Sequence, residues 1–216
     1  PISPLFDQVG PHARSVADLV LFDSVVANDW QKLDAAPLAG VRLGVVREYW
    51  FTDLDPEVEH LTTVALLRLE DAGAQIVEAR MPGLAELIDL TTDTIQNHDV
   101  RTALANYLRE YGAGVDFDTV VAQASPDIQR LFRRDVLPGG KNFVTEAAYV
   151  AARDTHLPAL RRLYQEYFAQ TQTAAMIFPT TLVPAPRIGE ETTLEVRGHR
   201  LPFETAVARN IAPGST

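Results

Sequence analysis

The sequence predicts an α/β fold whose sheet contains at least one parallel β–α–β unit. Two short β-branched runs bounded by turn residues, at 41–46 and 75–79, are typical of buried strands. The segment between them carries apolar residues at helical spacing. A helix that joins two strands of one sheet implies parallel strands and a right-handed crossover.

The helix of this unit has clear boundaries in the sequence. Asp55, Pro56 and Glu57 supply a capping side chain, a proline for the first turn and an acid near the positive end of the helix dipole. Gly73 is a typical residue for the helix end. The apolar positions between them repeat at helical spacing, and they are Val58, Leu61, Ala65 and Leu69.

Further helices are expected on both sides of this unit. Residues 14–27 predict a buried helix, because Ser15 and Asp18 resemble a capping box and apolar residues then cover most of the circumference. Residues 84–111 predict helix in one or two pieces, and a shorter helix is expected at 127–135.

A last long helix is expected at 145–172, with a kink or break near Asp154 because Pro158 cannot continue the backbone ladder. Its expected buried face consists of Leu157, Leu160, Tyr164 and Phe168.

Few strands are expected for a chain of 216 residues. Residues 174–178 predict a third strand, ended by Pro179, and residues 191–196 an edge strand or hairpin arm. The total of three or four strands leads us to expect that the sheet is completed by polypeptide outside these residues. Residues 28–40 predict a polar loop.

Composition excludes several classes of protein. The formal net charge is −10 and no basic stripe is visible, so we expect no nucleic-acid partner. No apolar run is long enough for a membrane span, and no signal peptide is visible. Cysteine is absent, which excludes a thiol nucleophile and a disulfide framework. We therefore expect a cytoplasmic protein without a membrane partner.

No constellation of catalytic or cofactor-binding residues emerges from the sequence alone. The run 138–141 (PGGK) lacks the preceding strand and the glycine spacing of a phosphate loop. The five histidines show no metal-ligand spacing, and His98 and Asp99, as helical neighbours, point in different directions. No G-x-S-x-G motif is present, and Ser15 and Ser125 fit helix starts. We expect neither a metal nor another cofactor.

The first 27 residues, PISPLFDQVGPHARSVADLVLFDSVVA, resemble the amidase signature family just after its Gly/Ser-rich catalytic core. The pattern combines a Pro-x-Ser start, Asp7, the pair Gly10-Pro11 and the run 14–18 (RSVAD). Matches in family order follow at 38–46 (LAGVRLGVV), 55–58, 72–74 and 178–181, and residues 210–216 resemble the beginning of an Asn-x-x-Gly segment. The resemblance implies a partial amidase-signature fold with a mixed sheet flanked by many helices. Residues 1–216 would then be the middle-to-C-terminal portion of a single domain.

The resemblance implies hydrolysis of a carboxamide by a Ser–cis-Ser–Lys triad, with a small-molecule amide as the partner. In the family all three residues precede the motif that opens this sequence, so it implies no catalytic residue within 1–216. Lys32 and Lys141, the two lysines, lie in expected loops and do not match the lysine of the triad. The matching segments resemble most the bacterial amidases for aryl-acetamides such as mandelamide.

By analogy with the family, four residues are expected to line the substrate pocket: Phe143, Thr180, Thr181 and Val207. Two alternatives remain open. The first is a subunit of a transamidation enzyme that acts on misacylated tRNA. The second is a non-catalytic α/β binding module. The sequence indicates no oligomeric state.

Overall fold

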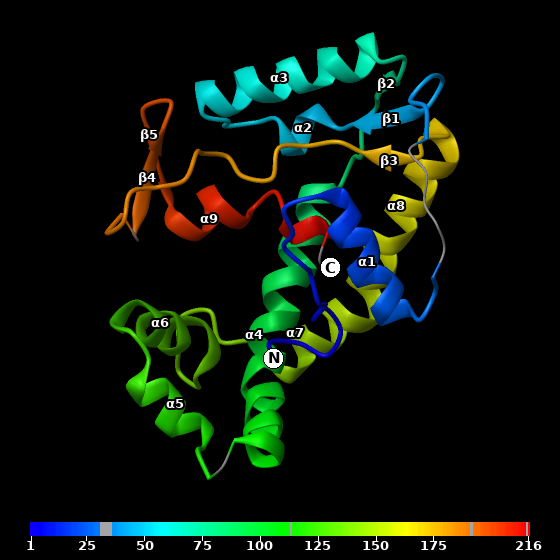
Figure 1. Ribbon diagram of the computed structural model, residues 1–216. Coiled ribbons are helices and arrows are strands. Elements are labelled where there is room, and N and C mark those ends of the chain that lie inside the picture. Colours follow the sequence, from blue (N-terminus) through cyan, green and yellow to red (C-terminus); the bar gives the residue numbers. More distant parts are fainter. Residues whose placement is uncertain (31–35, 113, 191, 215) are drawn as a thin grey trace.

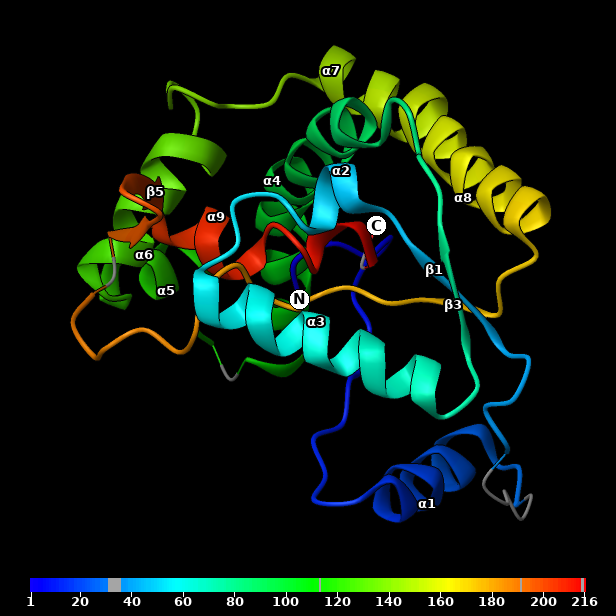
Figure 2. The same ribbon diagram turned by 90° about the horizontal axis from the view of Figure 1, so that it is seen from above.

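The core of the structure is a three-stranded parallel sheet with strand order β2-β1-β3 (Figure 1). The structure is a computed structural model that describes residues 1–30, 36–112, 114–190, 192–214 and 216. The strands are β1 (Arg42–Val45), β2 (Gln75–Glu78) and β3 (Ala175–Met176). In Figure 2, α3 (Pro56–Asp71) lies on one side of the strands, and α4 (Leu84–Tyr111) and α8 (Leu157–Thr171) lie on the other.

The predicted parallel β–α–β unit is confirmed. β1 and β2 pair in parallel, with Arg42 opposite Gln75, and α3 connects them. The Asp55 carboxylate caps α3 by accepting a hydrogen bond from the Glu57 N–H at 2.9 Å. Gly73 follows the helix with a φ of 97°, a conformation that favours glycine.

The two long helices on the same side of the sheet form one of the hydrophobic clusters of the core with the segments that follow the strands. α4 is one continuous helix of 28 residues, so the expectation of one or two pieces resolves to one. Apolar residues from the segment after β1, the short α2 (Arg47–Trp50), the segment after β2 and both long helices pack in one cluster, formed by Val46, Trp50, Met81, Leu84, Ile88, Leu160 and Tyr167. Of the four residues expected on the buried face of α8, Leu157 and Leu160 are buried, while Tyr164 and Phe168 are half-buried.

The predicted break near Asp154 is confirmed as a π-helical turn. α7 (Glu146–Ala151) passes into a π-helix at Ala152–His156, and α8 follows. Pro158 lies in the first turn of α8, where its missing N–H and its ring prevent a regular α-helical bond to the preceding turn.

The region between α4 and α7 contains more helix than the sequence predicted. The expected helix at 127–135 is present as α6 (Pro126–Leu131) and a π-helix at Phe132–Val136. A further helix, α5 (Phe117–Gln123), was not predicted. The Asp116 carboxylate caps it by accepting a hydrogen bond from the Thr119 N–H at 2.8 Å, so a capping signal was present.

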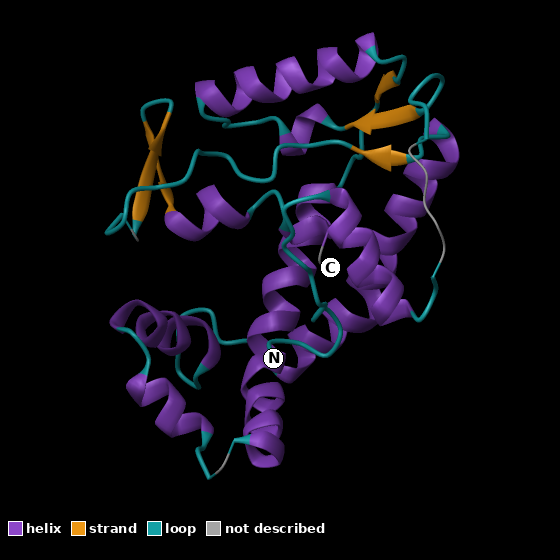
Figure 3. Cartoon of the chain, viewed as in Figure 1, coloured by secondary structure: helices purple, strands orange, loops and turns teal. Residues whose placement is uncertain are grey.

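A separate antiparallel hairpin lies at the other end of the molecule (Figure 3). It consists of β4 (Thr193–Val196) and β5 (His199–Pro202), so the predicted hairpin arm is confirmed. Strand β3 is shorter than the predicted 174–178, and the described residues hold five strands, which exceeds the expected three or four. α9 (Phe203–Ala208) and a 3₁₀ turn at Ala212–Gly214 complete the order of elements, with the short α2 (Arg47–Trp50) after β1.

The prediction of a buried helix at 14–27 is wrong about burial. α1 (Val16–Ala27) forms, and the Ser15 hydroxyl accepts a hydrogen bond from the Asp18 N–H at 3.2 Å. However, Ser24 is its only buried residue, because no other element described in the structure covers the helix. Lys32 and the other residues of 31–35, within the expected loop at 28–40, lie outside the described residues. None of the described helices has the length and apolar character needed to cross a bilayer.

Candidate functional site

A buried asparagine joins three segments that are far apart in the sequence. The Asn210 amide nitrogen donates hydrogen bonds to the carbonyl oxygens of Trp50, at 2.9 Å, and Pro179, at 2.8 Å. The Trp50 indole nitrogen donates in turn to the Asn210 carbonyl oxygen at 3.0 Å, and its ring stacks on Phe178. Asn210 is fully buried, so its side-chain amide forms hydrogen bonds with carbonyl oxygens of the protein in place of solvent water. The network fixes α2, the end of the β3 segment and residue 210 relative to one another.

Three of the four predicted pocket residues lie next to this network. Thr180 follows Pro179 and is exposed, and the Thr181 hydroxyl donates to the Val183 carbonyl oxygen at 2.7 Å. Val207 lies on α9 and packs against a cluster that includes Leu182 and Val183.

The loop after β3 is held to α9 by a backbone hydrogen bond from the Leu182 N–H to the Ala206 carbonyl oxygen, at 3.0 Å. The structure therefore brings Thr180, Thr181 and Val207 into one region. Their role in substrate binding stays a prediction.

Phe143, the fourth residue, comes from a different segment. It lies in the turn between the π-helix at 132–136 and α7, and its side chain is exposed. Its neighbours Asn142 and Val144 line a polar hollow of about 230 Å³ beside α4. Its role in substrate binding also stays a prediction.

A second hollow lies between α4 and α9. This α4–α9 hollow measures about 310 Å³, and α2, α4, α9 and the turn after α9 contribute its lining. Ile88, Ala208 and Ala212 supply apolar surface, and Tyr49 supplies an aromatic ring. Asp89, Asp93 and Glu204 add carboxylates. Asp93 also lines the polar hollow beside Phe143, so this residue belongs to both hollows.

The carboxylates of the two hollows differ in their electrostatics. Partial desolvation raises the pKa of Asp93, and the nearby carboxylates of Asp135 and Asp89 raise it further. Burial also opposes ionisation of Asp135. Hydrogen bonds from Arg134, at 2.7 and 2.6 Å, and from Asn142, at 2.8 Å, outweigh it and lower the pKa of Asp135. The ionised Asp135 carboxylate is therefore held by these hydrogen bonds, and through Asn142 it orders the turn at 137–142.

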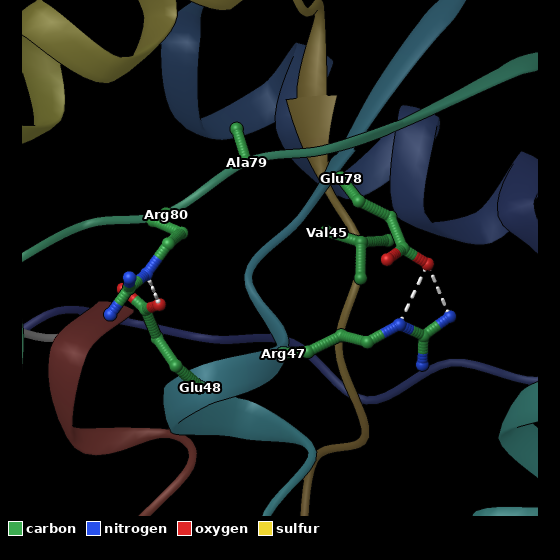
Figure 4. A pocket seen from close by; sticks show the side chains of 6 residues that line it. All are labelled: Val45, Arg47, Glu48, Glu78, Ala79 and Arg80. Carbon is green, nitrogen blue, oxygen red and sulfur yellow. Dashed lines mark hydrogen bonds and ion pairs between the residues drawn. The ribbon is translucent and has the colours of Figure 1, made fainter.

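A third hollow, of about 400 Å³, lies at the carboxyl ends of β1 and β2 (Figure 4). Its charged side chains form two ion pairs, Arg47 with Glu78 and Glu48 with Arg80, on either side of Val45 and Ala79. Hydrogen bonding from Arg47 lowers the pKa of Glu78. Each of these charged side chains is paired with an opposite charge. We therefore interpret the residues of this hollow as a contact between α2 and the end of β2 rather than as a reactive site.

No described group combines a nucleophile with an activating base. The Ser3 hydroxyl donates to the Asp99 carboxylate at 2.6 Å, whereas His98 lies 3.1 Å from Glu146 through Nε2 and stacks on Tyr149. His98 Nδ1 lies 3.6 Å from Asp99, beyond hydrogen-bond distance. Lys141 is exposed in a turn. Across the ranges that the structure describes, no three His, Asp or Glu side chains gather as metal ligands would.

The amidase family profile matches residues 1–207. The chain belongs to the amidase family. It is 37% identical over 188 residues to mandelamide hydrolase from Pseudomonas putida, a match that covers 84% of this chain and 37% of that protein. It is 29% identical over 216 residues to indoleacetamide hydrolase from Rhizobium radiobacter, across 100% of this chain and 46% of that protein.

Solved amidase structures share the fold. An amidase crystal structure superimposes with a TM-score of 0.70 at 22% identity, covering 100% of this chain and 45% of that one. The expected partial amidase-signature fold is therefore confirmed, and so is an amide-hydrolysing family. The chain spans less than half the length of the curated relatives named above.

Sequence reasoning missed the residues that build the site's frame. Trp50 and Asn210 carry the buried network, and Asp93 lines both hollows, but none of them was singled out for a role. Asn210 begins a segment that resembles the family, which was the available signal. Trp50 and Asp93 had no signal in the sequence. The role of Trp50 depends on contacts with segments more than a hundred residues away, and that of Asp93 on two hollows that several elements form together.

Proposed function

We propose that residues 1–216 are the middle-to-C-terminal portion of a single amidase domain that hydrolyses a carboxamide to an acid and ammonia. The family match along residues 1–207 is the observation that carries this proposal. The Ser–cis-Ser–Lys triad would lie outside these residues, because the opening segment resembles the part of the family that follows its catalytic core.

The role of this portion is to form one wall of the substrate pocket. In an amide hydrolysis of this type, a serine attacks the carbonyl carbon, a base takes its proton, and ammonia leaves before water releases the acid. The α4–α9 hollow offers apolar and aromatic surface that could position an acyl group for that attack. Thr180, Thr181 and Val207 would complete the same wall, with Phe143 at its edge.

An aryl-acetamide such as mandelamide is the proposed substrate class. Two relatives are named for mandelamide and indoleacetamide, and both align over most of this chain. Tyr49, Ile88 and Ala208 give the hollow the apolar lining that an aromatic ring prefers. A cytoplasmic location stays a prediction.

The test compares residues 1–216 with the longer polypeptide that its gene encodes. We expect the longer polypeptide to release ammonia from mandelamide or indole-3-acetamide and to lose this activity when the triad serine is replaced by alanine. We expect residues 1–216 alone to release none. Hydrolysis by residues 1–216 alone would refute the proposed position of the triad.

A second candidate function has one observation in its favour. The chain is 29% identical to a glutamyl-tRNA(Gln) amidotransferase component from Myxococcus xanthus, over 86% of this chain and 42% of that protein. A protein of that type would copurify with partner proteins and release ammonia for a misacylated tRNA. Turnover of free amides by the purified longer polypeptide, without any copurifying partner, would exclude this alternative.

A further inference from the structure

Arg209 holds the turn that follows α2. It directly follows α9 and lines the α4–α9 hollow together with Tyr49. Its Nη2 atom donates hydrogen bonds to the carbonyl oxygens of Thr52, at 2.7 Å, and Tyr49, at 3.3 Å. Its Nη1 atom donates to the Asp53 carboxylate at 3.1 Å. One planar guanidinium group therefore fixes three acceptors of this turn, which the single ammonium group of a lysine would not reproduce.

The same arginine fixes the aromatic ring of Tyr49. Its guanidinium lies over this ring, with the Cζ atom 5.8 Å from the ring centroid, a distance at which a cation–π attraction operates. In return, the Tyr49 hydroxyl donates a hydrogen bond to the Arg209 backbone carbonyl oxygen at 3.3 Å. The Trp50 ring meets the Tyr49 ring at an interplanar angle of 77°, with centroids 5.1 Å apart. The Tyr49 ring is therefore held by a cation, a carbonyl oxygen and a second ring.

The position of Tyr49 gives this arrangement a consequence for binding. Tyr49 is half-buried and lines the α4–α9 hollow. Burial raises the pKa of its hydroxyl, the Arg209 guanidinium opposes this rise, and the carboxylates of Asp89 and Asp93 add to it. The hydroxyl therefore stays protonated at neutral pH and keeps its hydrogen bond. A ring that is already held in place loses little side-chain entropy when another ring packs against it.

We propose that Tyr49 selects aryl amides over small aliphatic amides, and that Arg209 is a positioning residue that acts through the Tyr49 ring. This inference rests on the proposed function, because it assigns roles within the proposed substrate wall. The contact between two rings is the same before and during the attack on the carbonyl carbon. Its loss should therefore raise KM for an aryl amide and leave kcat nearly unchanged.

The experiment measures kcat and KM of the longer polypeptide with phenylacetamide and with propionamide. Tyr49→Leu keeps an apolar side chain but removes the ring. It should raise KM for phenylacetamide about 10-fold and change KM for propionamide less than about 2-fold. A loss of the same size for both amides would overturn the assignment of Tyr49.

Two substitutions test Arg209. Arg209→Met should raise KM for phenylacetamide about 5-fold, and Arg209→Lys, which keeps a cation near the ring, about 2-fold. KM for propionamide should stay nearly constant in both variants. A purely structural role of Arg209 would affect the two amides alike, and this result would overturn the positioning role. Arg209→Lys carries the test if Arg209→Met does not fold.

A double variant tests whether Arg209 acts through Tyr49. In the Tyr49→Leu background, Arg209→Met should not change the ratio of the kcat/KM values for the two amides any further, because the ring that Arg209 positions is gone. If the two substitutions instead changed this ratio independently, the positioning role would be wrong.

Arg197→Met is the matched control. Arg197 also holds the chain after α2, because its Nε atom donates to the Leu54 carbonyl oxygen at 2.7 Å and its guanidinium pairs with Glu59. It does not line the α4–α9 hollow. Arg197→Met should lower the melting temperature, as Arg209→Met does, but leave the ratio of the kcat/KM values unchanged. An equal change of this ratio in both variants would show that selectivity follows a general loosening of this segment, against the proposal.

Binding of phenylacetamide separates a failure of this inference from a failure of the proposed function. Saturation-transfer NMR detects the bound ring without any hydrolysis. A longer polypeptide that hydrolyses both amides without any dependence on Tyr49 would keep the proposed function and overturn this inference. One that hydrolyses neither amide would refute the proposed function. Phenylacetamide binding that weakens with Tyr49→Leu and Arg209→Met would then still support the inference, and a lack of binding would overturn it.

Discussion

Helices α1 and α8 are both rich in apolar residues, but the described chain covers only one of them. α8 has its apolar residues on one face, where Leu160 and Tyr167 pack against the sheet and α4. α1 carries apolar residues on nearly every face and has only Ser24 buried. The difference shows that apolar content predicts a need for burial, whereas the surrounding chain decides whether burial occurs.

The same contrast holds for polar groups. Asn210 and Asp135 are buried and hydrogen-bonded by side chains or carbonyls from other segments. Asp93 lines both hollows beside α4 and reaches solvent. We therefore divide the molecule into closed regions, whose contacts are complete within the described residues, and open regions, whose side chains face a hollow or solvent.

The largest expected effect is in the closed contact between α8 and the sheet. Leu160→Ala should lower the free energy of unfolding of residues 1–216 by about 3 kcal/mol, because it leaves a cavity in a position that is 1% exposed. The matched Leu21→Ala in α1 should change it by less than about 0.5 kcal/mol. Urea unfolding measures both values, and similar losses would contradict the contrast between the helices.

Asn210→Ala should cost about 2 to 3 kcal/mol in the same assay, because it leaves the carbonyl oxygens of Trp50 and Pro179 without their buried donor. Tryptophan fluorescence should report the loosening around Trp50 directly. Thr180→Ala, at the exposed position after Pro179, is the control and should be close to neutral. A neutral Asn210→Ala would show that the network does not fasten the three segments.

Gly44→Ala tests how closely α8 approaches β1. A Cβ atom at residue 44 would lie 2.3 Å from the Tyr167 hydroxyl oxygen, so the substitution should cost about 2 kcal/mol by overpacking. The Tyr167 hydroxyl is buried without a hydrogen-bond partner among the described residues, so Tyr167→Phe alone should be neutral or slightly stabilising. The double variant should recover part of the loss. Strict additivity of the two changes would contradict this contact.

The smallest expected effects compare Asp135 with Asp93. The folded pKa of Asp135 is below its unfolded value, so its contribution to stability is complete above about pH 4 and is lost as the pH falls through the folded pKa. The pKa of Asp93 is raised in the folded state, so its carboxylate costs stability at neutral pH, and this cost disappears as the pH falls towards about 4.

Asp135→Asn should therefore destabilise residues 1–216 by about 1 to 2 kcal/mol at pH 7, and Asp93→Asn should stabilise them by a few tenths of a kcal/mol, since that side chain reaches solvent. Both differences should shrink between pH 7 and pH 3 in urea unfolding. Effects of the same sign at pH 7 would contradict the assignment of closed and open carboxylates.

Local signals made part of the structure predictable. Asp55, Pro56 and Gly73 marked the ends of α3, and Pro158 marked the break before α8, because capping and proline geometry act within a few residues. The family resemblance predicted the fold. α5 was missed although Asp116 caps it, because its seven residues are too few for a periodic pattern.

The parallel β1–α3–β2 unit, the bounds of the long helices α3 and α4 and membership of the amidase family were predictable from the sequence, because they depend on short motifs and on periodicity. The tertiary structure alone decided that Asn210 meets Trp50 and Pro179, that Asp93 lines two hollows, and that α1 is uncovered. The first two depend on contacts between segments that are distant in the sequence. The third depends on the lack of such contacts to α1 among the described residues. Periodicity indicates which face of a helix must be buried, but the partner that buries it is known only once the chain has folded.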